Sequence, residues 1–197
     1  IDIKKLSELT IAELTKVIGL FYNDTFIMDQ NACSSPHLIV WIGDKYKKVK
    51  NNFWELLDSY VKNRYNLQTV SAVDKYNMFC QNAIEINIPF ELVRYGNHIY
   101  RVMLDELPEN IHNYRGNCGY FFEYNGKNLS EIIHIISGKY QTMTYFGMEK
   151  SLLKNFVIDN KLKGIDRIVP IGQALDMSLT WDGFDIIGSL SRIVDFN

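Results

Sequence analysis

The feature that most constrains the fold is an almost uninterrupted apolar run, His37-Leu38-Ile39-Val40-Trp41-Ile42, closed by Gly43-Asp44. A strand without polar alternation is typical of a sheet that is buried on both faces. Helical patterns flank this run in the sequence, at 10–24 and 45–65. Because such a sheet needs helices to cover it, the run predicts an α/β fold.

Helical and strand patterns alternate along the rest of the chain. Thr10 and Glu13 have the spacing of a capping box, and residues 1–8 are expected to be a lead-in segment. We expect further helices at 70–86, 129–136, 149–162 and 182–194, a hairpin formed by 90–95 and 98–104, and strands at 118–124, 141–146 and 168–171. This order predicts a mainly parallel sheet covered by helices on both faces, with a hairpin insertion. No repeat or clear linker interrupts the sequence, so we expect one domain over residues 1–197.

Two of these helices carry predictions about the side that faces the core. In the helix at 70–86, the residues available for packing are Val73, Met78, Phe79, Ala83 and Ile84, with Cys80 beside them in the core. In the last helix, Asp182 is expected to be the N-cap, and an apolar face is formed by Ile186, Ile187, Leu190 and Ile193.

Composition excludes several classes of protein. Of the 197 residues 47% are hydrophobic, which supports a substantial core, and the net charge of −2 gives no basic excess for nucleic acid. No stretch approaches the roughly 20 apolar residues of a membrane span, and the first residues of the given sequence show no signal-peptide pattern. Three cysteines cannot all pair within one chain, which favours a reducing cytoplasm. The basic residues Lys45, Lys47, Lys48 and Lys50 could hold phosphate, but a solvated helix face is the favoured interpretation.

The segment Asp29-Gln30-Asn31-Ala32-Cys33-Ser34-Ser35-Pro36 is the candidate reactive site. Small neighbours let a substrate carbonyl approach the Cys33 sulfur, and a turn can aim backbone N–H groups at an oxyanion. The alternative is that Cys33 is a small buried hydrophobe. Ser34 and Ser35 could donate to a thioester carbonyl, although satisfaction of backbone groups within the turn is the favoured interpretation.

Other chemistry has little support in the sequence. It contains no G-x-G-x-x-G, no G-x-x-x-x-G-K-[ST], no H-E-x-x-H and no G-x-S-x-G. A metal site is not indicated, because the four histidines, His37, His98, His112 and His134, lie far apart in the sequence. A dyad of Cys33 with His112 or His134 stays open, since dyads form in space and not in sequence.

The Cys33 segment resembles the active-site segment of the LuxC-type fatty acyl-CoA reductases, which are members of the aldehyde dehydrogenase superfamily. A second resemblance lies near the end of the chain, in Arg167-Ile168-Val169-Pro170-Ile171-Gly172-Gln173-Ala174-Leu175, Trp181-Asp182-Gly183-Phe184-Asp185 and Ser189-Leu190-Ser191-Arg192. The two segments follow one another along this sequence in the same order as in the family. For Asp182 a structural role is favoured over a catalytic one, and the roles of Trp181 and Arg192 stay open.

This resemblance implies a two-part enzyme of which the chain is the cysteine-bearing catalytic domain, with the cofactor-binding half absent. Cys33 would take the acyl group from fatty acyl-CoA or from an acylated partner such as an acyl-protein synthetase, and NADPH would reduce the acyl-enzyme to aldehyde. The backbone N–H of Cys33 would stabilise the oxyanion. The superfamily's cofactor-binding E-E-I-F-G-P motif does not appear in the region Tyr114–Phe121. The full-length enzyme is expected to be a homo-oligomer.

Three functions are therefore carried forward. The first is the catalytic domain of an NADPH-dependent fatty acyl thioester reductase, inactive as a reductase by itself. The second is a cofactor-independent cysteine hydrolase or acyltransferase, which needs a histidine beside Cys33. The third is a non-catalytic assembly domain, which needs the Cys33 sulfur to be sealed from solvent.

Overall fold

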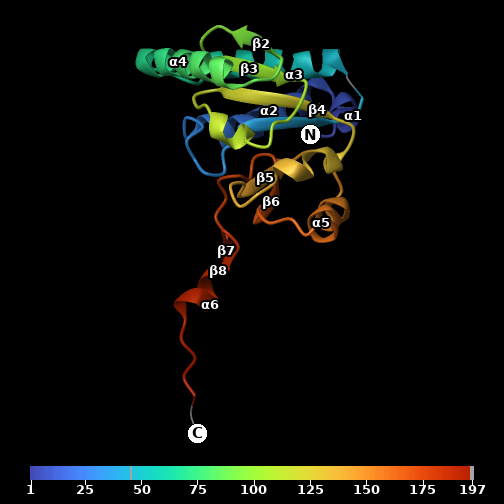
Figure 1. Cartoon of the computed structure of the whole chain (residues 1–197), viewed down its shortest axis with the longest axis vertical. Helices are drawn as coiled ribbons and strands as arrows, with labels where there is room; N and C mark the ends of the chain where they lie inside the picture. The colour runs from blue at the N-terminus through green and yellow to red at the C-terminus, as the bar shows by residue number, and fades with distance from the viewer. Residues whose placement is uncertain (45, 196–197) are drawn as a thin grey trace.

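The computed structural model describes residues 1–44 and 46–195, and its centre is a four-stranded sheet of order β1-β4-β3-β2 (Figure 1). The strands are β1 (Leu38–Ile42), β2 (Phe90–Tyr95), β3 (Ile99–Leu104) and β4 (Tyr120–Gly126). β4 pairs in parallel with both β1 and β3, and β2 and β3 form the expected antiparallel hairpin. Helices cover both faces of this sheet, so the predicted fold class is confirmed.

A smaller unit lies below the sheet in Figure 1. It contains two parallel strands, β5 (Thr142–Tyr145) and β6 (Arg167–Pro170), and the helix α5 (Lys150–Asp159) that connects them. The short 3-10 helix η2 (Leu129–Ile135) leads from the main sheet into this unit. The junction between the two units positions the candidate site.

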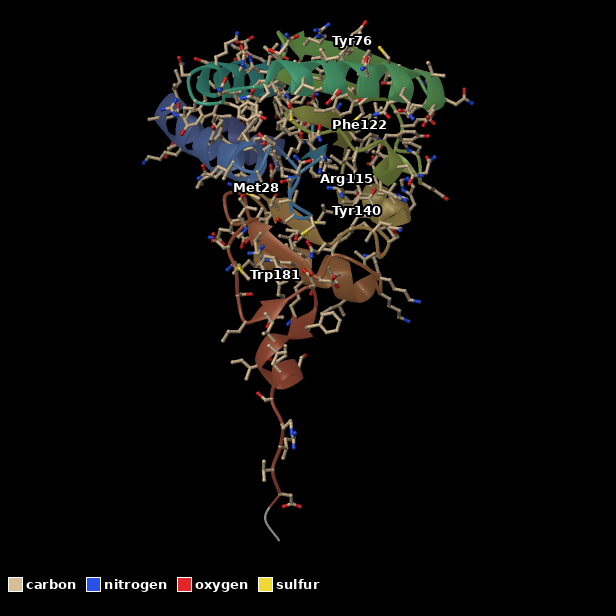
Figure 2. The ribbon with its side chains drawn as sticks, turned by 90° about the vertical axis from the view of Figure 1, so that its left-hand side faces the viewer. Met28, Tyr76, Arg115, Phe122, Tyr140 and Trp181 are labelled. Atoms are coloured by element: carbon tan, nitrogen blue, oxygen red, sulfur yellow. The ribbon has the colours of Figure 1, made fainter. Side chains whose placement is uncertain are left out.

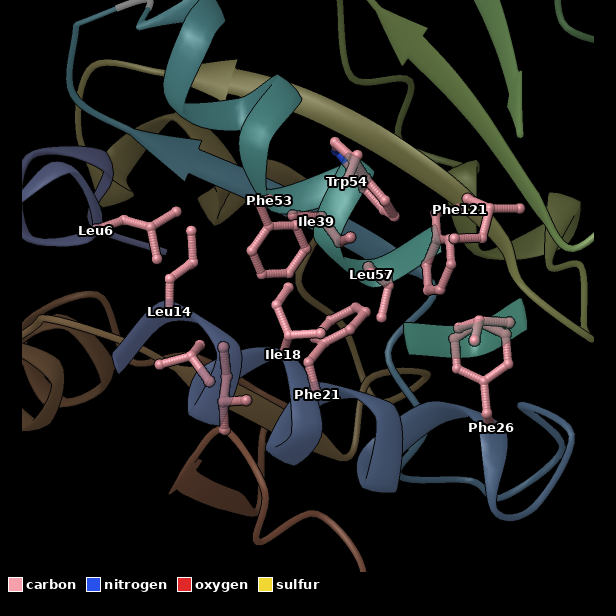
Figure 3. Packing of buried hydrophobic residues seen from close by; sticks show 14 of the residues in the cluster. Leu6, Leu14, Ile18, Phe21, Phe26, Ile39, Phe53, Trp54, Leu57 and Phe121 are labelled. Atoms are coloured by element: carbon pink, nitrogen blue, oxygen red, sulfur yellow. The ribbon is translucent and has the colours of Figure 1, made fainter. Parts of the chain in front are cut away.

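One face of the main sheet is covered by α2 (Ile11–Phe26) and α3 (Lys47–Lys62). The capping box of Thr10 and Glu13 begins α2, as predicted. Aromatic rings fill this side of the core, and Phe21 packs edge-on against Phe53 and tilted against Phe121 (Figure 3). The buried carboxylate of Glu123 lies among these rings; among its donors are Arg101 Nε at 2.6 Å, Trp41 Nε1 at 2.6 Å and Trp54 Nε1 at 3.0 Å.

The other face is covered by α4 (Thr69–Glu85) and the 3-10 helix η1 (Ile111–Tyr114), and the predicted inner face of α4 is partly wrong. Val73 is 53% exposed and Ile84 is 85% exposed, whereas Lys75 and Asn82 are the residues of α4 that are buried. The Lys75 ammonium donates to the carbonyls of His98 at 3.0 Å and Cys118 at 2.6 Å. Asn82 donates to the Tyr114 carbonyl at 2.9 Å. Cys80 is only half-buried, so its assignment to the core is not supported.

The apolar run of β1 is not buried equally on its two faces. Ile39 and Trp41 are fully buried against α2 and α3, whereas Leu38, Val40 and Ile42 are half-buried. The half-buried side chains line a cavity between the main sheet and the smaller unit. The lead-in segment also has structure: it contains the helix α1 (Ile3–Ser7), and Asp2 forms a parallel bridge with Ile42.

The predicted helix at 182–194 is wrong in its start and in its length, and only its middle part is helical. Residues 180–185 form a small hairpin of β7 (Thr180–Trp181) and β8 (Phe184–Asp185), and α6 extends only over Ile186–Leu190. Asp182 has φ of 51° in the hairpin turn and is not an N-cap. The expected apolar face stays exposed, with Ile193 at 99%, because this end of the chain extends away from the body (Figure 1).

The basic cluster is only partly described. Lys45 lies outside the described residues, and Lys47 and Lys48 are exposed, as a solvated helix face requires. Lys50 differs, since it is buried and donates to Asn125 Oδ1 at 2.6 Å. Within residues 1–44 and 46–195, none of the helices has the length and apolar character that crossing a bilayer requires.

Candidate functional site

Gln30 fixes the loop that carries Cys33. Its side chain is fully buried, with Nε2 donating to the carbonyls of Pro36 at 2.8 Å and Tyr120 at 2.9 Å. Oε1 accepts from the backbone N–H groups of Gly119 and Tyr120, both at 3.0 Å. Three of the four hydrogen bonds of this buried amide thus tie the loop to the start of β4, and the fourth, to Pro36, closes the loop on itself.

Cys33 lies in a tight turn beyond this anchor and is exposed. The turn is closed by a bond from the Ser35 N–H to the Ala32 carbonyl at 3.0 Å. Within the described chain, the backbone N–H groups of Cys33 and Ser34 make no hydrogen bond. An accessible thiol and two backbone N–H donors without a partner in the described chain therefore come from neighbouring residues of one turn, and such donors are what an oxyanion hole requires.

The Cys33 loop forms one wall of a cavity of about 190 Å³ between the main sheet and the smaller unit. The opposite walls come from β1, β4, η2 and β5, and their side chains are mostly apolar. These apolar side chains include Leu38, Val40, Phe122, Ile132, Ile135, Ile136 and Met143. In Figure 2, Arg115 and Tyr140 lie at this junction, with Phe122 above them. An apolar group attached to the Cys33 sulfur would have a cavity to enter.

Several residues that line the cavity hold buried polar atoms without a partner among the described residues. These atoms are Ser35 Oγ, His37 Nδ1, His112 Nδ1, Tyr140 Oη and Gln141 Oε1. Burial raises the pKa of Tyr140 to about 12, so its hydroxyl stays protonated at neutral pH. Buried polar atoms usually have partners, so these atoms give the cavity wall polar positions that a ligand can pair with.

Ser34 and Ser35 do not have the role that the sequence favoured. Both residues are 5% exposed, and neither hydroxyl hydrogen-bonds to a backbone group within the described chain. The turn is held instead by Gln30 and by its own backbone, so the interpretation of the serines as partners of the turn is wrong. Their role toward a substrate carbonyl stays a prediction.

No histidine is bonded to the Cys33 sulfur among the described residues. His112 lines the same cavity, with its ring at 6.1 Å from the Tyr140 ring, but makes no bond to Cys33. His134 is bonded through Nε2 to the Leu107 carbonyl at 2.9 Å and does not line the cavity. The hydrolase alternative therefore lacks its general base in this arrangement. The assembly alternative required a Cys33 sulfur that is sealed from solvent, and Cys33 is exposed instead.

His37, for which the sequence indicated no catalytic role, lies on the cavity wall four residues after Cys33. Its Nε2 is 2.8 Å from a terminal nitrogen of Arg115. Burial, together with the Arg115 charge, lowers the pKa of His37 to about 4, and a backbone group of Gly116 opposes this weakly. The imidazole is therefore neutral at physiological pH. The described residues contain no group of three or more metal-ligating side chains.

The segment near the end of the chain that resembles the reductases, which begins at Arg167, packs beside α2. This helix leads into the Cys33 loop. Asp24 is buried at the end of α2 and accepts from the N–H groups of Gly172 at 2.6 Å and Ala174 at 2.9 Å. Arg167 holds the same loop from within, donating to the carbonyls of Gln173 and Ala174, both at 2.7 Å, and stacks on Trp181 at 5.0 Å. The motif thus acts as a structural support for the Cys33 side of the molecule.

Asp182 contacts the cavity indirectly. Its carboxylate accepts a hydrogen bond from the side-chain amide of Gln141, a residue of the cavity wall. This contact agrees with the favoured structural role of Asp182, although the mechanism differs from the predicted helix cap. Arg192 is exposed beyond α6, and nothing in the described chain gives it a role.

The cavity beside Cys33 does not fit a whole nicotinamide dinucleotide. The cavity beside Cys33 has about 190 Å³ and mostly apolar walls, whereas pockets for drug-sized ligands, which are smaller than a dinucleotide, hold roughly 300–1,000 Å³. The sequence also lacks the glycine-rich loop that holds a pyrophosphate at a helix N-terminus.

Comparisons with known proteins bear on the fold. A protein from Sinorhizobium meliloti 1021 assigned as a methylmalonate-semialdehyde dehydrogenase, solved in complex with NAD, is similar to this chain with a TM-score of 0.51. The chain shares its fold with part of this dehydrogenase. The match covers 81% of the chain but only 37% of the dehydrogenase, at 11% sequence identity. No protein-family model and no curated protein sequence matches the chain.

Proposed function

We propose that the chain is the thiol-bearing catalytic part of an NADPH-dependent fatty acyl thioester reductase. The observation that carries this proposal is the exposed Cys33 thiol at the wall of an apolar cavity. The resemblance of the Cys33 segment to fatty acyl-CoA reductases and the fold shared with a semialdehyde dehydrogenase both support it.

The chemistry of this chain is acyl transfer. The Cys33 thiolate attacks the thioester carbonyl, the oxyanion is stabilised by the N–H groups of Cys33 and Ser34, and the donor leaves as a free thiolate. One carbon–sulfur bond forms and another breaks, so the step is nearly balanced and reversible. The product is an acyl-Cys33 thioester.

The cavity is suited to the part of the acyl chain nearest the sulfur. Each buried methylene contributes about 0.8 kcal/mol, so the apolar wall of Leu38, Val40 and Phe122 favours an alkyl group over a polar one. A cavity of about 150 Å³ binds benzene, and this one has about 190 Å³. It therefore holds the first carbons of a fatty chain and not its whole length.

Reduction of the acyl-enzyme requires a bound nicotinamide cofactor, which supplies the hydride. The semialdehyde dehydrogenase of similar fold was solved with NAD, and NADPH is the cofactor of the resembling reductases. We propose that the nicotinamide cofactor is held by a cofactor-binding part of the enzyme that lies outside these residues. The acyl donor would be acyl-CoA or an acylated protein, and the assembled enzyme would be a homo-oligomer.

Acylation tests the proposal without the cofactor. The protein is incubated with a medium-chain acyl-CoA, and intact mass is followed together with the thiol that is released. We expect one acyl group per chain, one equivalent of coenzyme A, and removal of the adduct by hydroxylamine. Release of fatty acid with no adduct would favour the hydrolase alternative instead.

A further inference from the structure

The charges that line the Cys33 cavity are of one sign. Arg115 and Lys139 are its charged side chains, both are exposed, and none of the side chains that line it in the described part is a carboxylate. Clefts lined by one sign of charge concentrate ligands of the opposite sign and raise their association rates. The lining is therefore matched to an anionic ligand.

Arg115 keeps its full charge because its partner is neutral. A guanidinium can only donate, so His37 Nε2, 2.8 Å away, must be the acceptor and carry no proton. No carboxylate forms an ion pair with Arg115 among the described residues, where the ion pairs are those of Lys5, Lys62 and Arg101. The imidazole thus orients Arg115 without neutralising it.

The backbone that carries Arg115 is closely packed. A Cβ on Gly116 would lie 2.2 Å from the Tyr120 ring, so only glycine allows the loop to lie this close. Asn117 donates to Asn31 Oδ1 at 3.1 Å and so joins this loop to the Cys33 loop. Arg115 is accordingly a preorganised cation.

Arg115 also borders a second hollow. This hollow, of about 180 Å³, lies outside the Cys33 loop, and its lining residues are Gln30, Asn31, His37, Arg115, Gly116 and Asn117. Its walls are polar amides and backbone, in contrast to the apolar cavity. Arg115 therefore lines both an apolar compartment that contains the thiol and a polar one that is open to solvent, and His37 lines both with it.

We infer that Arg115 binds the phosphate of a phosphopantetheinyl thioester, the form in which the acyl group arrives. The inference rests on the proposed acyl transfer to Cys33. Such a donor joins an apolar acyl group to a polar phosphate-bearing arm. The acyl group matches the apolar cavity that contains Cys33, and the arm matches the polar hollow beside Arg115. Coenzyme A and the prosthetic arm of an acyl carrier protein share this chemistry.

The test compares three hexanoyl donors in Cys33 acylation, followed by intact mass at low salt. Hexanoyl-CoA and hexanoyl-phosphopantetheine carry phosphate, and the N-acetylcysteamine thioester does not. For Arg115→Gln we expect the rate ratio of hexanoyl-CoA to the phosphate-free thioester to fall about tenfold, the size of one charge-assisted hydrogen bond. Arg115→Lys should restore most of the ratio, which excludes a folding defect, and added salt should lower the wild-type ratio.

The donors distinguish the two sources of phosphate. If Arg115→Gln lowers the acylation rate with hexanoyl-phosphopantetheine as much as it does with hexanoyl-CoA, the phosphate that the two donors share is the recognised group. If the rate falls only with hexanoyl-CoA, the recognised groups are the phosphates of its nucleotide. Arg64→Gln, an exposed arginine stacked on Tyr60 away from the cavity, is the matched charge control and should leave the ratio unchanged.

A ratio unchanged in Arg115→Gln overturns the inference and leaves the acyl transfer intact. The inference also fails, with the acyl transfer intact, if the phosphate-free succinyl thioester is preferred over the hexanoyl one, since the anion would then lie on the acyl group. Failure of every donor to acylate Cys33 overturns the proposed function and the inference with it.

Discussion

Asp24 and Gly172 are 148 positions apart in the sequence, yet Asp24 Oδ2 accepts from the Gly172 N–H at 2.6 Å. Gly172 has φ of 96°, and Leu20 packs against its Cα within the space that a Cβ would occupy. Burial raises the pKa of Asp24, although the two N–H bonds oppose this. The contact joins the loop after β6 to the helix that leads into the Cys33 loop, and so unites the two segments that resemble the reductases.

Gln30→Ala should destabilise the protein by about 3 kcal/mol, because it leaves buried N–H groups of Gly119 and Tyr120 without an acceptor. Urea unfolding measures this change. Gln81→Ala is the control, since Gln81 is exposed on α4 and should shift stability by no more than about 0.5 kcal/mol. Equal effects of the two variants would show that the Gln30 amide does not hold the loop.

The stability of the protein should rise with pH through the titration of Lys75. Burial lowers the pKa of Lys75 from 10.5 to about 8. Between these values the unfolded chain binds a proton that the folded chain does not, so the free energy of unfolding increases with pH. From pH 7 to pH 10 the gain is about 2.5 kcal/mol for this residue alone.

Urea unfolding of wild type and Lys75→Met at both pH values isolates this gain. The wild type should become more stable relative to the variant as the pH rises. Lys16→Met removes an exposed lysine of α2 and should show no such change relative to wild type. If the difference in free energy of unfolding between wild type and Lys75→Met stays constant with pH, Lys75 is charged in the folded protein at pH 10.

The burial of Lys75 also shows where sequence reasoning fails. The stripe of α4 that faces the sheet has regular helical spacing, with Ala72, Lys75, Phe79 and Asn82 followed by Ile86. Apolar periodicity could not identify it, because two of its members are polar and find their partners in carbonyls that are distant in sequence. The α/β class, the hairpin and most elements were predictable, because their apolar patterns and turn residues are local.

The candidate site was predictable only in part. Cys33 was proposed from its small neighbours and from the resemblance, since both are properties of one short segment. The pairing of His37 with Arg115 spans 78 positions and leaves no local pattern. The hairpin turn at Asp182 was missed because an aspartate before a helical pattern is also typical of an N-cap.

The 197-residue chain by itself should not oxidise NADPH in the presence of acyl-CoA. The cavity beside Cys33, of about 190 Å³, is too small for a dinucleotide, and hydride transfer requires the nicotinamide within about 3–3.5 Å of the acyl carbon. Absorbance of the reduced nicotinamide measures this directly. Steady oxidation that is lost in Cys33→Ala would place a cofactor site within the chain and refute the expectation.

Cys33 is proposed to take the acyl group, and peptide mapping of the acylated protein tests this central claim most directly. The three cysteines differ in exposure: Cys33 is exposed, Cys80 half-buried and Cys118 buried. After incubation with acyl-CoA, we predict a hydroxylamine-sensitive acyl group on the peptide that contains Cys33. It should be absent in Cys33→Ala and present in Cys80→Ala and Cys118→Ala. An acyl group on Cys80 or Cys118, or an adduct that survives in Cys33→Ala, would contradict the claim.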